Sequence, residues 1–178
     1  LPEAQLDRFL FAIRVPYPDP SEELEIIKQT APPTSVELEV ALDAGSILKI
    51  QDVVPRVPVA DHVFKFALRL ARLSRPQEAE APLYVREYLS WGAGPRAAQN
   101  LMRSARARAL LHGRFHVTLE DVEGVAMPVL AHRLVTNFNA DSEGIAAADI
   151  VERLLRDVPR DGAARRGDAA SATKDGGE

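Results

Sequence analysis

Residues 91–106 constrain the fold most, because they join a glycine-rich turn to a long helical pattern. Gly92 and Gly94 favour a turn, and Pro95 suits the first position of a helix because its φ is already helical and it has no N–H to lose. Apolar residues then recur at helical spacing. The pattern predicts a helix that begins at Pro95 and stops at Gly113, a residue type that readily adopts the left-handed conformation past a helix end.

Arg96 follows Pro95 at once and therefore falls in the first turn of this helix. The N-terminal end of a helix carries partial positive charge, so a cation there does not stabilise the helix itself. The same end attracts anions, and phosphate above all. Two interpretations of Arg96 stay open on these residues alone: it meets an anionic ligand, or it pairs with a nearby carboxylate.

The remainder of the chain favours a mainly α fold. Alanine is frequent and aromatic residues make up only 6% of the chain, a composition that leans helical. Asp19 with Pro20, and Thr118 with Asp121, are expected to begin two of the helices. Helices are predicted over residues 2–9, 20–30, 44–53, 61–75 (capped by Asp61), 95–112, 118–130 and 145–158, whereas 131–143 should be irregular and the chain from 159 onward disordered.

Residues 9–15 are apolar apart from Arg14, which is typical of a strand buried on both faces of a parallel sheet. No other convincing strand follows, so we expect the rest of such a sheet to lie outside this chain. The chain also opens on Leu1 without an initiator methionine, and we treat it as a fragment. An uncovered strand of this kind favours pairing with a second copy of the chain.

Charge and composition exclude several classes of function. The formal net charge of −4 disfavours a general nucleic-acid role, and the lack of cysteine excludes disulfides and thiolate metal sites and fits the cytoplasm. No apolar run reaches the ~20 residues that span a bilayer. Gly113 separates His112 from His116 and no third ligand has suitable spacing, so no metal site is expected. Neither a nucleophilic triad nor a glycine-rich phosphate loop is present.

The long helix carries arginines without a single acid, and this basic face offers an alternative function. A stand-alone helical module could bind an acidic partner or nucleic acid through residues 95–114. A blander interpretation is a purely structural bundle, in which the arginines are solvated or pair with the acidic flank at 19–43, and the overall charge favours it. The arginines concerned are Arg96, Arg103, Arg106, Arg108 and Arg114.

Several short motifs, in their order and spacing, resemble the MoxR family of AAA+ ATPases over residues 1–157. They are Leu1-Pro-Glu-Ala-Gln-Leu-Asp-Arg-Phe9, Tyr17-Pro18, Gly94-Pro-Arg-Ala97, Val117-Thr-Leu-Glu-Asp-Val122 and His132-Arg-Leu134. The resemblance implies a helical lid bundle at 19–158, preceded at 1–18 by a remnant of the α/β ATPase core, namely a short helix and one strand. The tail at 159–178 matches nothing in the family.

The resemblance also implies roles for two arginines. Arg8 would be the arginine finger, which reaches the γ-phosphate held by a neighbouring subunit. Arg96 would be the sensor-2 arginine of its own subunit, with Gly94 and Pro95 beside the nucleotide. The parent protein would bind ATP and Mg²⁺, form a ring, usually a hexamer, and remodel or activate a partner that often has a von Willebrand A domain. Walker A and Walker B would precede Leu1, so this chain alone should neither bind ATP well nor hydrolyse it.

Overall fold

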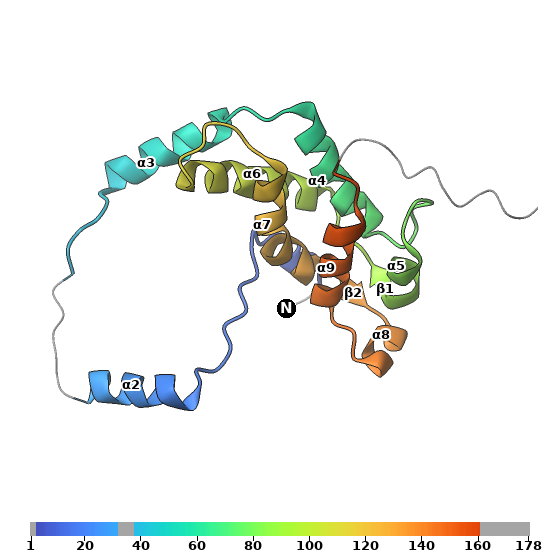
Figure 1. Ribbon diagram of the computed structural model, residues 1–178, viewed down its shortest axis with the longest axis horizontal. Helices are drawn as coiled ribbons and strands as arrows, with labels where there is room; N and C mark the ends of the chain where they lie inside the picture. The colour runs from blue at the N-terminus through green and yellow to red at the C-terminus, as the bar shows by residue number, and fades with distance from the viewer. Residues whose placement is uncertain (1–2, 32–37, 161–178) are drawn as a thin grey trace, which may run out of the picture.

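The computed structural model describes residues 3–31 and 38–160 of this chain, and most of them are helical. Figure 1 shows a bundle built from the helices after residue 60, with α2 lying apart from it. The elements in chain order are α1 Glu3–Leu6, α2 Pro20–Thr30, α3 Ala44–Val53, η1 Val54–Arg56, α4 Asp61–Leu73, α5 Leu83–Tyr88, β1 Leu89–Trp91, α6 Pro95–Leu111, α7 Leu119–Leu130, η2 Ala131–Arg133, β2 Val135–Thr136, α8 Phe138–Glu143 and α9 Ala147–Asp157.

The core lies where α4, α6, α7 and α9 meet. Each of these helices has an apolar side that faces the others, so the large side chains on those sides are buried against one another. Burial of one such side chain stabilises the fold by about 1.5–3 kcal/mol. The largest apolar side chains that are completely buried are Leu70, Leu101, Leu130, Ile150 and Leu154.

A buried carboxylate ties α6 to α7. Asp121 is wholly buried, and its oxygens accept hydrogen bonds from Arg108 at 3.0 Å and from Arg114 at 2.5 and 2.6 Å. The same side chain accepts from the backbone N–H of Thr118, and this completes the capping box predicted at the start of α7. Burial alone would raise the pKa of Asp121, but the donors around it hold that pKa well below its usual range.

A short antiparallel ribbon closes one end of the bundle. Strand β1 pairs with β2, and the register places Leu89 opposite Thr136 and Trp91 opposite Val135. Residues 131–143, for which the sequence predicts irregular structure, instead form η2, β2 and α8. The prediction failed because the ribbon pairs segments distant in sequence, so neither strand has a local signature.

The N-terminal region departs most from the sequence predictions. Helix α1 ends at Leu6 rather than at residue 9, and the strand predicted at 9–15 is wrong, because this segment is irregular and exposed. A strand needs a partner, and the described part of the chain offers none beside this segment. The N-cap of α4 is Ala60 rather than Asp61. The tail predicted to be disordered falls, from residue 161 onward, outside the described residues.

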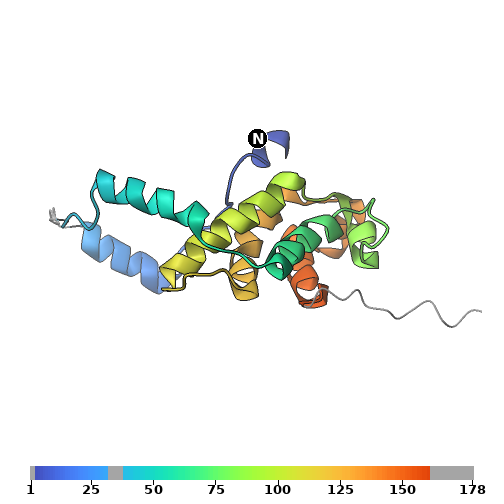
Figure 2. The same ribbon diagram turned by 90° about the horizontal axis from the view of Figure 1, so that it is seen from above.

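Helices α2 and α3 form as predicted but stay outside the core. The side chain of Asp19 caps α2, with Pro20 at the first position, in a complete capping box. No residue of α2 or α3 is buried. Figure 2, seen from above, shows α3 leading into the bundle along α6. Among residues 3–31 and 38–160, no helix combines the length and the hydropathy that crossing a membrane requires.

Candidate functional site

One cavity of about 540 Å³ brings together residues from three separate parts of the chain. The N-terminal turn contributes Asp7, the start of α6 contributes Arg96, and the end of η2 contributes His132 and Arg133. Trp91, Gly92, Gly94 and Val135 complete the lining. The cavity therefore combines cationic side chains with a helix N-terminus, two features that favour an anionic ligand.

The turn before α6 is clamped to the end of α4. The N–H of Ala93 donates to Ser74 Oγ at 2.9 Å, and the Nε of Arg75 donates to the Ala93 carbonyl at 2.8 Å. Gly92 passes so close that a Cβ there would lie 2.2 Å from the Ser74 carbonyl oxygen. Both backbone groups of Ala93 thus bind the two residues that follow α4, and these bonds fix the position of the α6 N-terminus.

Arg96 lies in the first turn of α6, as the sequence predicts. Its side chain is 57% exposed, and its Nη1 lies 3.6 Å from Oδ2 of Asp7. This distance is too long for a hydrogen bond, so the pair is loose. No side chain caps the N-terminus of α6, where Gly94 is the N-cap residue. The carboxylate neighbour expected in one interpretation is present, and contact with an anionic ligand stays a prediction for a side chain that is still accessible.

Arg133 is almost completely buried and is bound on all sides. Its Nε donates to Asp7 Oδ1 at 3.2 Å, and its Nη2 donates to the carbonyl of Asp7 at 3.0 Å and to that of Phe9. Its Nη1 donates to the Val129 carbonyl at the end of α7. Burial lowers the pKa of Arg133, and the Asp7 carboxylate opposes that shift.

His132 supports the same turn from η2. Its Nε2 lies 3.3 Å from the Phe9 carbonyl and donates to it when that nitrogen carries the proton. Burial, and after it the charge of Arg133, lowers the pKa of His132 below its ordinary value of 6.5. The imidazole is therefore neutral at pH 7 and adds no charge to the cavity.

Arg8 is exposed and does not line this cavity. It lies in the turn after α1, between the two residues whose carbonyls Arg133 holds. The ion pairs found among residues 3–31 and 38–160 do not include it. The structure therefore brings Asp7 to Arg96 but does not bring Arg8 into the cavity.

Sequence reasoning missed Asp7 and Arg133 as members of the site. Both fall within motifs that carry the family resemblance, but nothing local connects two residues 126 positions apart. The one local signal was an arginine three residues after the end of the apolar helix α7. Such an arginine becomes buried only when acceptors are brought to it.

The basic face of α6 is largely used inside the bundle. Arg108 and Arg114 bind Asp121, and Arg106 donates from Nε to the Val57 carbonyl at 3.2 Å. Pairing with the acidic flank at 19–43 is wrong for the described residues, because the ion pairs of these arginines go to Asp121 and Asp7 instead. The described residues contain no cluster of His, Asp or Glu that could hold a metal ion.

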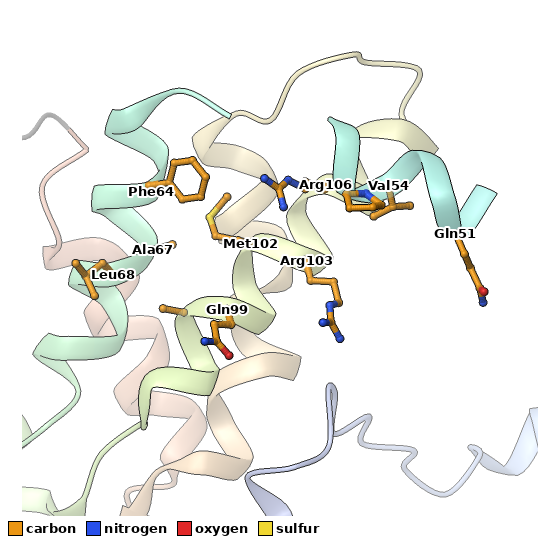
Figure 3. Close-up of a pocket in the computed structure, with 11 residues that line it drawn as sticks. Gln51, Val54, Phe64, Ala67, Leu68, Gln99, Met102, Arg103 and Arg106 are labelled. Atoms are coloured by element: carbon orange, nitrogen blue, oxygen red, sulfur yellow. The ribbon is translucent and has the colours of Figure 1, made fainter. Parts of the chain in front are cut away.

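A second cavity, of about 780 Å³, lies between η1, α4 and α6 and is mainly apolar. Figure 3 shows Phe64 and Met102 close together, with the guanidinium of Arg103 lying away from them. None of the residues around Arg96 and Asp7 lines it. Its chemistry suits an apolar group, so it is a less suitable phosphate site than the smaller cavity.

The comparisons with known proteins give one family match and two relatives that align with most of the chain. The family described as the AAA lid domain matches residues 82–154. The chain is 36% identical over 160 residues to Chaperone MoxR1 of Mycobacterium tuberculosis. This alignment covers 89% of this chain and 42% of that protein. It is 32% identical over 159 residues to the uncharacterized protein YeaC of Bacillus subtilis, covering 89% and 47%.

Two further similarities involve a shorter match and a solved structure. A segment of 43 residues, 24% of this chain and 13% of its relative, is 51% identical to Protein MoxR of Paracoccus denitrificans. The crystal structure of a presumed ATPase from Cytophaga hutchinsonii superposes with a TM-score of 0.81 at 33% identity, covering 89% of this chain and 48% of that one. The chain thus spans less than half the length of these relatives.

Proposed function

The chain belongs to the MoxR family of AAA+ ATPases, and on this premise we propose that it supplies the lid and finger elements that sense ATP and help to hydrolyse it. The observation that carries the proposal is Arg96. An accessible guanidinium stands at the uncapped N-terminus of a long helix, inside a cavity that joins the lid to the N-terminal turn. Such a group suits the terminal phosphate of a nucleotide.

Arg96 acts in this proposal as the sensor-2 arginine, with Gly94 and Pro95 shaping its approach. Phosphoryl transfer spreads negative charge over the three equatorial oxygens of the γ-phosphate. The planar guanidinium can donate to two of those oxygens at once, and an ammonium cannot reproduce this geometry. The clamp from Ser74 and Arg75 holds the start of α6 in place, so Arg96 needs only a side-chain rotation to leave Asp7.

Arg8 acts as the arginine finger for a neighbouring subunit. Its exposure and its absence from the cavity of Arg96 fit a group that works on another copy's nucleotide. A finger of this kind is worth about 10³–10⁵ in turnover. The parent would therefore assemble as a ring, for which we propose six subunits, because each site needs a side chain from the next subunit.

ATP and Mg²⁺ would be held mainly by other parts of the longer protein. The residues present fit the terminal phosphate alone, since Gly94, Pro95 and Arg96 offer a helix start and one cation. The nearest carboxylate, Asp7, is engaged by Arg133 and is a poor ligand for Mg²⁺. We expect this chain by itself to bind ATP weakly and not to hydrolyse it. The work of the ring would be to remodel or activate a partner, for which a von Willebrand A domain protein is the candidate.

The experiment compares single substitutions in the parent protein that contains this chain. Arg8→Ala should abolish ATP turnover and leave ATP binding intact, whereas Arg96→Ala should slow hydrolysis and weaken nucleotide affinity. Arg103→Ala, an exposed arginine two turns further along α6, is the matched control and should behave like the parent. Wild-type turnover in both site variants would overturn the assignment.

The alternative function, binding of an acidic partner or nucleic acid through residues 95–114, has weaker support. Arg108 and Arg114 are occupied by Asp121, and Arg106 by a backbone carbonyl. A binding titration with a DNA duplex at two salt concentrations separates the two functions, because phosphate contacts give a steep salt dependence.

A further inference from the structure

Arg133 holds the backbone on both sides of Arg8. Its Nη2 donates to the carbonyl of the residue before Arg8, Asp7, at 3.0 Å and to that of the residue after it, Phe9. Its Nε binds the Asp7 side chain as well. Arg133 therefore reaches the peptide groups that set the direction of the Arg8 side chain without contacting that side chain.

The turn has little else to fix it. Helix α1 has four residues, and a helix of that length is not stable by itself. The turn's own backbone bonds, Arg8 N–H to Gln5 O and Phe9 N–H to Leu6 O, measure 3.3 and 3.1 Å. The additional supports come from the same part of the bundle, namely His132 at the Phe9 carbonyl and the Ala12 N–H, which donates to Pro128 O at 2.9 Å.

Burial of Arg133 makes this arrangement specific. The side chain is 1% exposed, and a buried guanidinium is tolerated only when its donors are satisfied. Three of its four hydrogen bonds go to Asp7 and Phe9. The fourth goes to the carbonyl of Val129, near the end of α7. The N-terminal turn is thus the principal partner of a charge that the lid has buried.

We propose that Arg133 is the positioning residue for Arg8, so that the lid sets the direction of the finger offered to the next subunit. The inference rests on the proposed function of Arg8. Arg133 touches no nucleotide in this scheme. Its effect passes through the Asp7 and Phe9 carbonyls, and a turn that moves by about 1 Å costs roughly 10²-fold in rate.

The first test measures the turn directly in this chain and does not depend on any ATPase activity. The chain has no cysteine, so Arg8→Cys with a nitroxide label gives a single reporter whose mobility is read by electron paramagnetic resonance. Arg133→Lys, which keeps the charge but not the fork of donors, should make the label distinctly more mobile. Asp7→Asn leaves the buried guanidinium in place and should give a smaller increase. Arg156→Lys, an exposed arginine on α9, is the control.

The second test uses the trans action of Arg8 in the parent protein. Arg133→Lys should lower kcat by about 10²-fold with KM for ATP unchanged. Mixing these subunits with Arg96→Ala subunits should restore turnover, because the second kind donates an intact finger to sites of the first kind. In a random equal mixture about one interface in four has that arrangement. A subunit that merely failed to fold would gain nothing from mixing.

The outcomes separate the two ideas. If the label in Arg133→Lys is as immobile as the label in the chain that keeps Arg133, the positioning role is overturned, whatever the ATPase assay gives. A mobile label with normal turnover would overturn the positioning role, and Arg8→Ala would decide separately whether Arg8 is a finger. A mobile label, lower kcat and recovery on mixing together support the proposal.

Discussion

The guanidinium of Arg96 lies 3.6 Å from the carboxylate of Asp7, the residue that immediately precedes Arg8. The other oxygen of that carboxylate accepts a hydrogen bond from Arg133. One acid is therefore shared by an accessible cation and a buried one. Its bond to the buried cation is the shorter, so Arg96 is the partner that can leave when a phosphate arrives.

Asp7→Asn should strengthen the binding of polyphosphate to this chain. The substitution removes the negative charge that competes for Arg96, and an exposed ion pair is worth about 0.2–1 kcal/mol, which corresponds to at most about fivefold in affinity. Calorimetric titration with inorganic tripolyphosphate measures the change. Arg96→Ala in the Asp7→Asn background should cancel the gain, and an affinity equal to that of the parent would contradict the prediction.

Asp121→Ala should destabilise the bundle by about 3–5 kcal/mol, because it leaves Arg108 and Arg114 without their shared partner at a buried site. Urea unfolding followed by circular dichroism gives the difference in the free energy of unfolding. Asp149→Ala, at the exposed start of α9, removes an acid from a helix cap without such a network and should cost about 1 kcal/mol. Equal losses in the two variants would refute the role given to the Asp121 network.

Acid should remove the same stabilisation. The folded-state pKa of Asp121 is depressed below the ordinary value of 3.8, so the unfolded chain binds the proton first as the pH falls. The contribution is complete above about pH 5 and is lost progressively as the pH falls from there through the folded-state pKa. Unfolding free energies between pH 7 and pH 3 should fall less steeply in Asp121→Asn than in the parent; parallel curves would be the contrary result.

Gly92→Ala should displace the turn that leads to Arg96. The new Cβ would meet the Ser74 carbonyl oxygen at 2.2 Å and the Arg75 Cα at 2.6 Å, and both are backbone atoms that cannot rotate aside. We expect a loss of about 1–3 kcal/mol in stability, as for other overpacked sites. Gly94→Ala is the matched control, because no atom lies within 4 Å of its Cβ, and it should cost about 1 kcal/mol or less as an N-cap change. Thermal unfolding that fails to rank the two in this order would count against the clamp.

Features encoded by neighbouring residues were predictable from the sequence. The start of α6 at Pro95 and the capping boxes at Asp19 and Thr118 each depend on residues within one turn of the chain. The left-handed Gly113 after α6, with φ of 69°, is equally local. The position of Arg96 followed from the same information.

Features that depend on distant partners were not predictable. The ribbon of β1 and β2 joins segments 45 residues apart, and the contacts of Arg133 with Asp7 span 126. The apolar run at 9–15 has the composition of a buried strand, yet without a neighbouring strand its backbone takes no such form here. The roles of Arg8 and Arg96 in catalysis stay predictions, as do the ring, the client and the cytoplasmic location.

The separation between Asp7 and Arg133 also has a consequence for biosynthesis. At about 5–20 residues per second, the ribosome adds Arg133 roughly 6–25 seconds after Asp7. During that interval the N-terminal turn lacks its hydrogen bonds to the bundle, since these come from the end of α7 and from η2. A nascent chain would accordingly acquire an ordered turn at Arg8 only when its lid is nearly complete. Productive assembly with a neighbouring subunit would therefore wait until the lid has been synthesised.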